Sequence, residues 1–145
     1  MGPNNAIAVT TDAVYVAGEA WSTNFPGTND SIQPNHSSSM DGVISKLSLD
    51  LPRIIQSTYF GGNNSDSIKT MAINANAVYV AGITLSNSLP VISGGAQSTY
   101  GGGIYGGDAM IAKIPLSLNS QIINSCYNLC LPSRGGWRSI LQQMD

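Results

Sequence analysis

The chain has a single histidine, His36, and it is the first residue to consider for acid–base chemistry. Histidine titrates near neutral pH, and together with a serine and an aspartate it can form a nucleophilic triad. The Gly-x-Ser-x-Gly pattern of one large hydrolase class is absent from the sequence. Since no spacing selects a partner serine, we expect His36 to be a solvated loop residue in the polar segment 34–37.

Two cysteines, Cys126 and Cys130, could in principle bind a metal. A structural zinc site needs four ligands, and the chain has no second pair of Cys or His residues to complete one. The spacing fits either a disulfide in an oxidising compartment or two free thiols, and both alternatives stay open. The acidic residues form no Asp-x-Asp-x-Asp-Gly calcium loop. The sequence therefore predicts no metal and no other cofactor.

The segment 101–107 holds five of the 16 glycines. A phosphate-binding loop would end in Gly-Lys-Ser or Gly-Lys-Thr and would lead into a helix. Here the following residues have the alternating pattern of a strand. The segment is therefore expected to be a loop between two strands.

Charge is sparse, because only 10% of the residues are charged and the net charge is −2. The six basic residues are scattered, whereas nucleic-acid binding leaves a clustered basic surface. No apolar run approaches the roughly 18 residues that a membrane-spanning helix needs. Residues 1–5 lack the features of a signal peptide. We expect no nucleic-acid partner and no membrane span, and we expect the chain to be a piece of a longer protein.

The segments that must form the strands of this chain occur twice in the sequence. Ala13–Gly18 recurs without change as Ala77–Gly82, displaced by 64 residues. Asp41–Leu47 then matches Asp108–Ile114 at a displacement of 67, so the second copy has three extra residues, which we place in the glycine-rich segment 101–107. A fixed long displacement indicates an internal repeat.

Each copy contains four predicted strands in the same order. They are about 6–11, 13–20, 42–49 and 53–59 in the first copy, and about 70–74, 77–84, 109–116 and 121–127 in the second. The first two strands of each copy must form a tight hairpin, and Asp12 and Asn76 suit turns with a left-handed backbone. More than twenty residues rich in Ser, Asn, Gly and Pro join the second and third strands.

The repeated strand is apolar on both sides. Val78 and Val80 alternate with Tyr79 and Ala81, so neither face is polar. Such a strand belongs to a sheet that is covered on both faces. The repeat has no segment of helical period to provide that cover, so other sheets must provide it. The sequence predicts an all-β protein of radially stacked, four-stranded antiparallel blades.

Four segments of the chain stand out together: Ser57–Gly62, Val78–Gly82, Phe25–Pro26 and Asp108–Lys113. In this combination they resemble the SBBP (seven-bladed β-propeller) repeat family. That repeat typically reads Ser-Thr-Tyr-apolar-Gly-Gly, Val-Tyr-Val-x-Gly, Phe-Pro and Asp-Ala-Phe-Val-Ala-Lys. The resemblance covers roughly residues 6–127. It implies propeller blades at 6–60 and 61–127, with a tail at 128–145 outside the repeat.

The resemblance also implies how the chain works. The family's repeat carries no catalytic residues, so we expect a structural or binding scaffold rather than an enzyme. Family members are often secreted or attached to the cell surface, which implies an extracellular location. Two blades cannot close a ring, so the expected partners are further blades or a second copy of the chain. Apolar faces left open favour association by about 25 cal/mol per Å² covered.

Two alternatives stay open. The first is a propeller enzyme with a site at the central channel, for which His36 and Asp30 are the candidate residues. The second is a carbohydrate- or protein-binding module that uses the long loops. Candidate loop contacts for such a ligand are Trp21, His36 and Tyr105.

Overall fold

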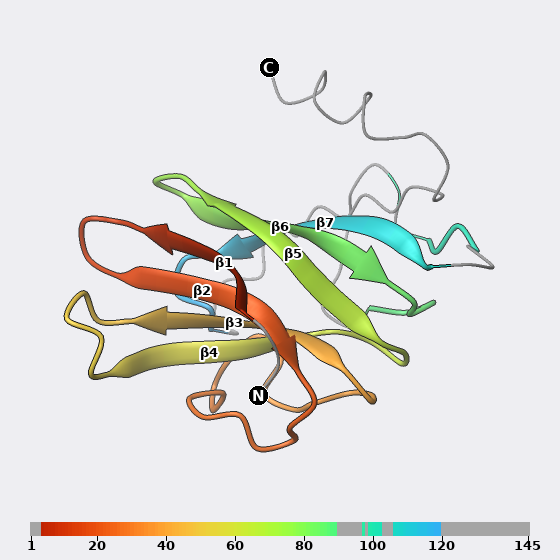
Figure 1. The fold of residues 1–145 in the computed structure, drawn as a ribbon, viewed down its shortest axis with the longest axis horizontal. Helices are drawn as coiled ribbons and strands as arrows, with labels where there is room; N and C mark the ends of the chain where they lie inside the picture. The colour runs from red at the N-terminus through yellow and green to blue at the C-terminus, as the bar shows by residue number, and fades with distance from the viewer. Residues whose placement is uncertain (1–3, 90–96, 98, 103–105, 120–145) are drawn as a thin grey trace.

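The protein is all-β, with two antiparallel sheets in the computed structural model (Figure 1). The structure describes residues 4–89, 97, 99–102 and 106–119. The first sheet has the order β1-β2-β3-β4 and the second has the order β5-β6-β7. The strands are β1 (Asn4–Val9), β2 (Val14–Ala20), β3 (Asp41–Leu47), β4 (Ile54–Phe60), β5 (Asp66–Ile73), β6 (Ala77–Thr84) and β7 (Asp108–Pro115). Within the described ranges, no helix is long and apolar enough to cross a membrane.

Seven of the eight predicted strands are present, in the predicted order. Their bounds agree within about two residues except for β5, which begins at Asp66 rather than near residue 70. The eighth predicted strand, 121–127, lies outside the described residues, as do Cys126, Cys130 and the tail 128–145. The all-β prediction is therefore confirmed.

The two sheets pack against each other through one apolar core. In Figure 1 the second sheet lies over the first, and β5 crosses β1, β2 and β3. The core joins residues of both sheets: Tyr15, Ala17, Ile44 and Phe60 from the first, and Ile68, Val78, Val80, Met110, Ala112 and Ile114 from the second. Side chains of this size bury enough apolar surface to hold two sheets together.

The two sheets bury opposite faces of the repeated unit. In the first sheet the core side chains on the repeated strand are Tyr15 and Ala17, whereas in the second sheet they are Val78 and Val80. Within the repeat, Val78 and Val80 correspond to Val14 and Val16, which lie on the other face of β2. Stacking of this kind is directional, because one face of the first copy meets the opposite face of the second.

An irregularity in the hydrogen-bond ladder is also repeated. The register shifts around Asn5 where β1 pairs with β2, and around Lys69 where β5 pairs with β6. These two residues are 64 positions apart, so the same β-bulge occurs in both copies. A bulge inserts one unpaired residue and increases the local twist of the strand.

The two tight hairpins form as predicted, but without a left-handed turn. Thr10 Oγ1 accepts the Ala13 N–H at 3.1 Å, and Asn74 Oδ1 accepts the Ala77 N–H at 3.0 Å. Asp12 and Asn76 are not among the residues with positive φ, so the expected left-handed backbone was wrong. The side chain that precedes each turn caps it instead, which removes the need for an unusual φ.

The long connection 21–40 runs along the free edge of β4. The Gly27 and Gln33 carbonyls accept hydrogen bonds from the N–H groups of Ser57 (2.7 Å) and Tyr59 (3.0 Å). The Ile32 N–H in turn donates to the Leu118 carbonyl at 3.1 Å. The connection therefore joins β4 to the chain that follows β7.

Candidate functional site

The structure places two of the three predicted contact residues in the connection 21–40. Trp21, which follows β2, is 52% exposed. His36 is partly buried near the end of the connection. Tyr105 lies outside the described residues. His36 lies close to the backbone at the start of the connection, because it bonds to Ala20, the residue that precedes Trp21.

The His36 ring is held against the first sheet rather than solvated. Its Nε2 lies 3.0 Å from the Ala20 carbonyl, so Nε2 carries a proton and donates. The ring also packs in a T-shaped arrangement with the Tyr59 ring, with centroids 5.3 Å apart. The expectation of a solvated histidine was therefore wrong, because the path of the loop carries the ring onto Ala20 and Tyr59.

Tyr59 anchors the start of the same connection. Its hydroxyl donates to the Ser22 carbonyl at 2.6 Å and accepts the Phe25 N–H at 2.8 Å. The Phe25 side chain packs on Ala20, Val43 and Tyr59, which form a second small apolar cluster. One strand residue thus fixes both Phe25 and His36, and this makes the connection a structured surface.

A polar cluster that the sequence analysis missed lies where the two sheets meet. The Glu19 carboxylate accepts hydrogen bonds from Lys69 Nζ at 2.6 Å, from Ser67 Oγ and from Asn5 Nδ2. Asn5 Nδ2 also donates to the Ile68 carbonyl at 2.7 Å. The residues of both bulges therefore converge on one carboxylate, and they tie the sheets together.

The balance of effects on Glu19 keeps it ionised. Burial raises its pKa, but the hydrogen bonds from Lys69, Ser67 and Asn5 and the charge of Lys69 outweigh burial, so the pKa is lowered. A signal was present in the sequence, since Glu19 stands where the second copy has Ile83. With these donors already bonded to Glu19, the arrangement is that of an ionic link between sheets.

Three buried carboxylates lie at the first residues of strands, and each accepts a hydrogen bond from a backbone N–H group. Asp41 Oδ2 accepts the Ser37 N–H at 2.7 Å, and Asp108 accepts the Gly101 N–H. Asp66 Oδ2 accepts the Gly62 N–H at 2.7 Å, while burial raises the pKa of Asp66 despite these bonds. Asp41 and Asp108 stand at equivalent positions of the two copies, and each accepts a backbone N–H at the entry to its strand. Among the described residues, no three His, Cys, Asp or Glu side chains are grouped to hold a metal.

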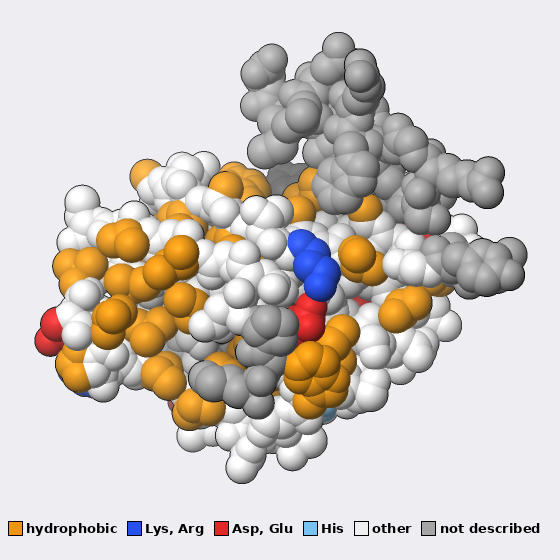
Figure 2. Space-filling view, viewed as in Figure 1, with side chains coloured by type: hydrophobic (Ala, Val, Ile, Leu, Met, Phe, Trp, Pro, Cys, Tyr) orange, Lys and Arg blue, Asp and Glu red, His pale blue; other side chains and the backbone are white. Residues whose placement is uncertain are grey.

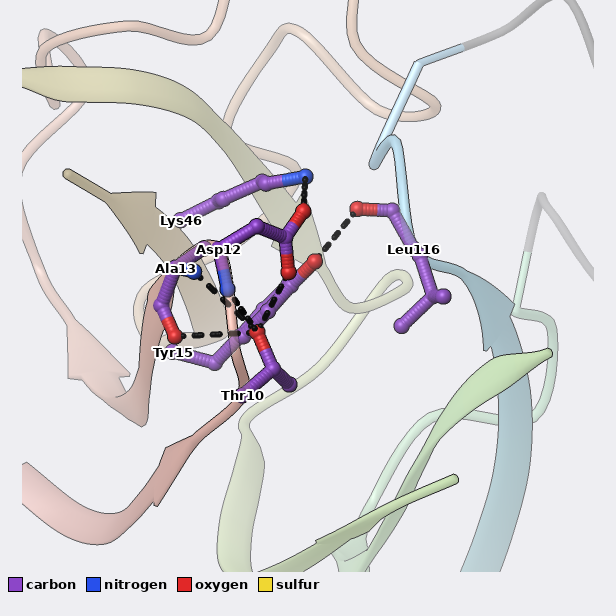
Figure 3. A network of polar contacts seen from close by, with 6 residues as sticks. All are labelled: Thr10, Asp12, Ala13, Tyr15, Lys46 and Leu116. Atoms are coloured by element: carbon purple, nitrogen blue, oxygen red, sulfur yellow. Dashed lines mark hydrogen bonds and ion pairs between the residues drawn. The ribbon is translucent and has the colours of Figure 1, made fainter. Parts of the chain in front are cut away.

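A tyrosine links the sheets at the opposite end of β2 (Figure 3). The Tyr15 hydroxyl donates to the Leu116 carbonyl at 3.0 Å. Lys46 Nζ lies 5.5 Å from the centre of the Tyr15 ring and 4.0 Å from Asp12 Oδ2. The Lys46–Asp12 pair is largely exposed on the Asp12 side, so the Tyr15–Leu116 bond carries the link.

The first sheet also leaves part of one apolar face exposed. We call the side of this sheet that points away from the core its outer face, and it carries Ile7, Val9, Val14, Val16 and Leu47. Phe25 of the connection 21–40 covers Val43 and Tyr59 on this face, and Val14 is only 6% exposed. Ile7 and Val9 are 68% and 65% exposed. Figure 2 shows apolar side chains gathered over the end of the first sheet where the hairpin turns lie. Such a contiguous apolar surface is typical of a contact with another protein surface.

Comparisons with known proteins return no match, either to a protein-family model or to a curated protein. The resemblance to the SBBP repeat therefore stays a prediction that rests on the repeated residues. The features of the molecule that bear on its function are the repeat, the two unlike sheet faces and the contacts of the connection 21–40.

Proposed function

We propose that this chain is a propeller-type repeat segment that acts as a non-catalytic scaffold. Each copy of the repeat, 6–60 and 61–127, would form one blade, with 128–145 outside the repeat. The observation that carries the proposal is the single core between two sheets that present opposite faces of one repeated unit. Units that stack in this directional way can be added in series.

The proposed role needs no chemistry from the chain. The one histidine is bonded to the Ala20 carbonyl and to no serine or aspartate side chain in the described part of the chain. The scaffold would work without a cofactor, and as part of a larger secreted or surface protein, as the SBBP resemblance implies. Its working surfaces are the faces of its sheets and its long connections.

The blade architecture is tested by hydrogen exchange. The repeat predicts a fourth strand of the second blade at 121–127, outside the described residues. Amide protons there are expected to exchange as slowly as those of β4, since ladder bonds protect backbone N–H groups. Rapid exchange over 121–127 beside a protected β7 would contradict a four-stranded second blade.

The absence of catalysis is tested with a panel of ester, peptide and glycoside substrates. The wild type and the His36→Ala variant are expected to give the same background rate. A turnover that the wild type shows and His36→Ala loses would overturn the scaffold role in favour of a channel-site enzyme.

A second candidate function is recognition of a carbohydrate or protein surface at Trp21. The observation that favours it is the 52% exposure of the Trp21 side chain beside a connection that Tyr59 holds in place. Aromatic rings on a rigid support are common contact residues for such ligands. Binding on a glycan array that Trp21→Ala abolishes, and that His36→Ala leaves intact, would support it.

A further inference from the structure

In the second copy of the repeat, the face that corresponds to the outer face of the first sheet is covered. Ile7 and Val9 are 68% and 65% exposed. Their equivalents 64 positions later, Met71 and Ile73, are partly buried and pack against the shared core. The same positions of one repeated unit are thus covered in the second sheet and bare in the first.

The central strands show the same contrast. Val80 and Ile114 are 1% and 2% exposed in the core, whereas their equivalents Val16 and Leu47 are only partly buried. Val14 and Val43, the equivalents of Val78 and Met110, are each 6% exposed, so the contrast is confined to part of the face. The first sheet covers Val80 and Ile114 with the face that carries Tyr15, Ala17 and Ile44. A surface with the residues Tyr15, Ala17 and Ile44 therefore fits a face of this kind, and a surface with their equivalents would fit the outer face of the first sheet.

The matching cover is present in the same chain. We call the side of the second sheet that points away from the core its outer face, and it carries Tyr79, Ala81 and Ile111, the equivalents of Tyr15, Ala17 and Ile44. These three residues are only partly buried, whereas their equivalents in the first copy are at most 1% exposed.

We propose that the outer face of the first sheet binds the outer face of the second sheet of a second copy of this chain, head to tail. Within the described part of the chain no further sheet supplies this cover, because the second sheet already occupies the opposite face of the first. The inference rests on the proposed stacking of repeat units and extends it to contacts between separate chains. Contacts of this kind join unlike surfaces, so they build rings or open chains of subunits.

The internal interface also predicts one specific bond between copies. Within the chain, the Tyr15 hydroxyl donates to the Leu116 carbonyl (Figure 3). The equivalents of these residues are Tyr79 and Leu49. Between copies, the Tyr79 hydroxyl of one chain is therefore expected to donate to the Leu49 carbonyl of the next.

The experiment measures self-association by sedimentation over a range of protein concentrations. A first variant, Ile7→Lys with Val9→Lys, places two charges on the outer face of the first sheet, at positions too exposed to disturb the fold. A second variant, Ala81→Lys with Ile83→Lys, charges the outer face of the second sheet. The control, Ala75→Lys with Asn76→Lys, adds the same charge in the exposed β5–β6 turn.

The wild type and the control are expected to associate as concentration rises. Each face variant alone is expected to associate more than about tenfold more weakly, because a charge is costly to bury in an apolar contact. A mixture of the two face variants is expected to form a one-to-one heterodimer through the faces that each retains. Tyr79→Phe is expected to weaken association by about 2- to 10-fold, the loss of one hydrogen bond.

Two results would overturn the inference. A wild type that stays monomeric at every concentration would show that the outer face has no second copy as its occupant. Self-association that the second face variant retains would show that like faces pair instead. Neither result bears on the scaffold role, which the exchange of 121–127 and the substrate panel decide separately.

Discussion

At the scale of single residues, Glu19 is the strongest chemical difference between the two copies of the repeat. Its equivalent is Ile83, which is 37% exposed, whereas Glu19 is 8% exposed and bonded to Lys69 of the other sheet. A buried carboxylate is stabilising only while its donors are in place, and removing one partner leaves the other without compensation. The Glu19 cluster therefore adds a polar link between the two sheets beside their apolar core.

Glu19→Gln is expected to lower the free energy of unfolding at neutral pH by about 1 kcal/mol, since part of the link to the half-exposed Lys69 is screened by solvent. The folded-state pKa of Glu19 lies below its ordinary value of 4.5. Its contribution is therefore fully present above that pH and is lost as the pH falls through the lowered pKa. Urea melts at neutral and acidic pH measure the difference between the two proteins.

The matched control for Glu19→Gln is Asp12→Asn. The Asp12 side chain is 72% exposed and lies 4.0 Å from Lys46 Nζ. Its loss is expected to leave the neutral-pH melt unchanged within error. A difference between wild type and Glu19→Gln that persists undiminished in acid would contradict an ionised Glu19 in the folded protein.

The candidate contact residues could be found from the sequence, but their surroundings could not. Trp21 and His36 stand out by residue type alone, and both lie in the first long connection between predicted strands. The bond from His36 to Ala20 depends on where a loop returns to a strand, and no local pattern encodes that return. Glu19 was visible as a charge in an apolar strand, yet its partners Ser67 and Lys69 are 48 and 50 positions away.

At the scale of elements, the repeated strand and the bulge beside it are fitted closely. A Cβ at Gly82 would run into the Ser67 carbonyl, next to the bulge at Lys69. A Cβ at Gly42 would lie 2.8 Å from Cγ1 of the buried Ile68 side chain and 3.0 Å from the Phe60 carbonyl oxygen. The equivalent of Gly42 in the second copy is Ala109. The contact with Ile68 at Gly42 therefore belongs to the packing between the two sheets, whereas the contact with Phe60 lies within the first sheet.

Gly82→Ala is expected to destabilise the fold by more than about 3 kcal/mol, because the backbone of β5 would have to shift. Gly42→Ala is expected to cost less, about 1 to 2 kcal/mol, because its nearest neighbour is the Ile68 side chain rather than strand backbone. Thermal melts of the two variants give the order. Equal melting temperatures would show that the bulge does not hold the Ser67 carbonyl against Gly82.

The bond between Tyr15 and Leu116 links elements of the two sheets. Tyr15→Phe keeps the buried ring and removes only the hydroxyl, so it is expected to cost about 1 kcal/mol in the isolated chain. Tyr79→Phe, at the equivalent place on the second sheet, is expected to leave the stability of the dilute chain unchanged. Denaturant melts at low protein concentration compare the two, and an equal loss in both would contradict the assignment of Tyr15 as the sheet-to-sheet link.

Most of the strands were predictable, because apolar alternation and the repeat both indicate where the local backbone is extended. The bulges were not, since they are defined only by pairing with a neighbouring strand. The start of β5 at Asp66 was missed for the same reason, because the strand continues through the bulge at Lys69. The two-sided apolar pattern of the repeated strand predicted sheets over both of its faces, and in the described part of the chain the other sheet covers one face of each copy.

At the scale of the whole molecule, stability and association are linked. Anything that binds the folded state raises the apparent stability, so an associating protein melts at a temperature that depends on its concentration. The melting temperature of the wild type is expected to rise with protein concentration. The melting temperature of the variant Ile7→Lys with Val9→Lys is expected to stay constant, and scanning calorimetry over a concentration series checks both.

The covered edge of β4 restricts the ways in which the first sheet can be extended by further strands. The carbonyls of Gly27 and Gln33 already occupy the N–H groups of Ser57 and Tyr59. An incoming extended peptide finds no free ladder there, and on β1 the bulge at Asn5 interrupts the opposite border. Lateral, amyloid-like lengthening of the sheet is thereby discouraged, while stacking perpendicular to the strands stays open.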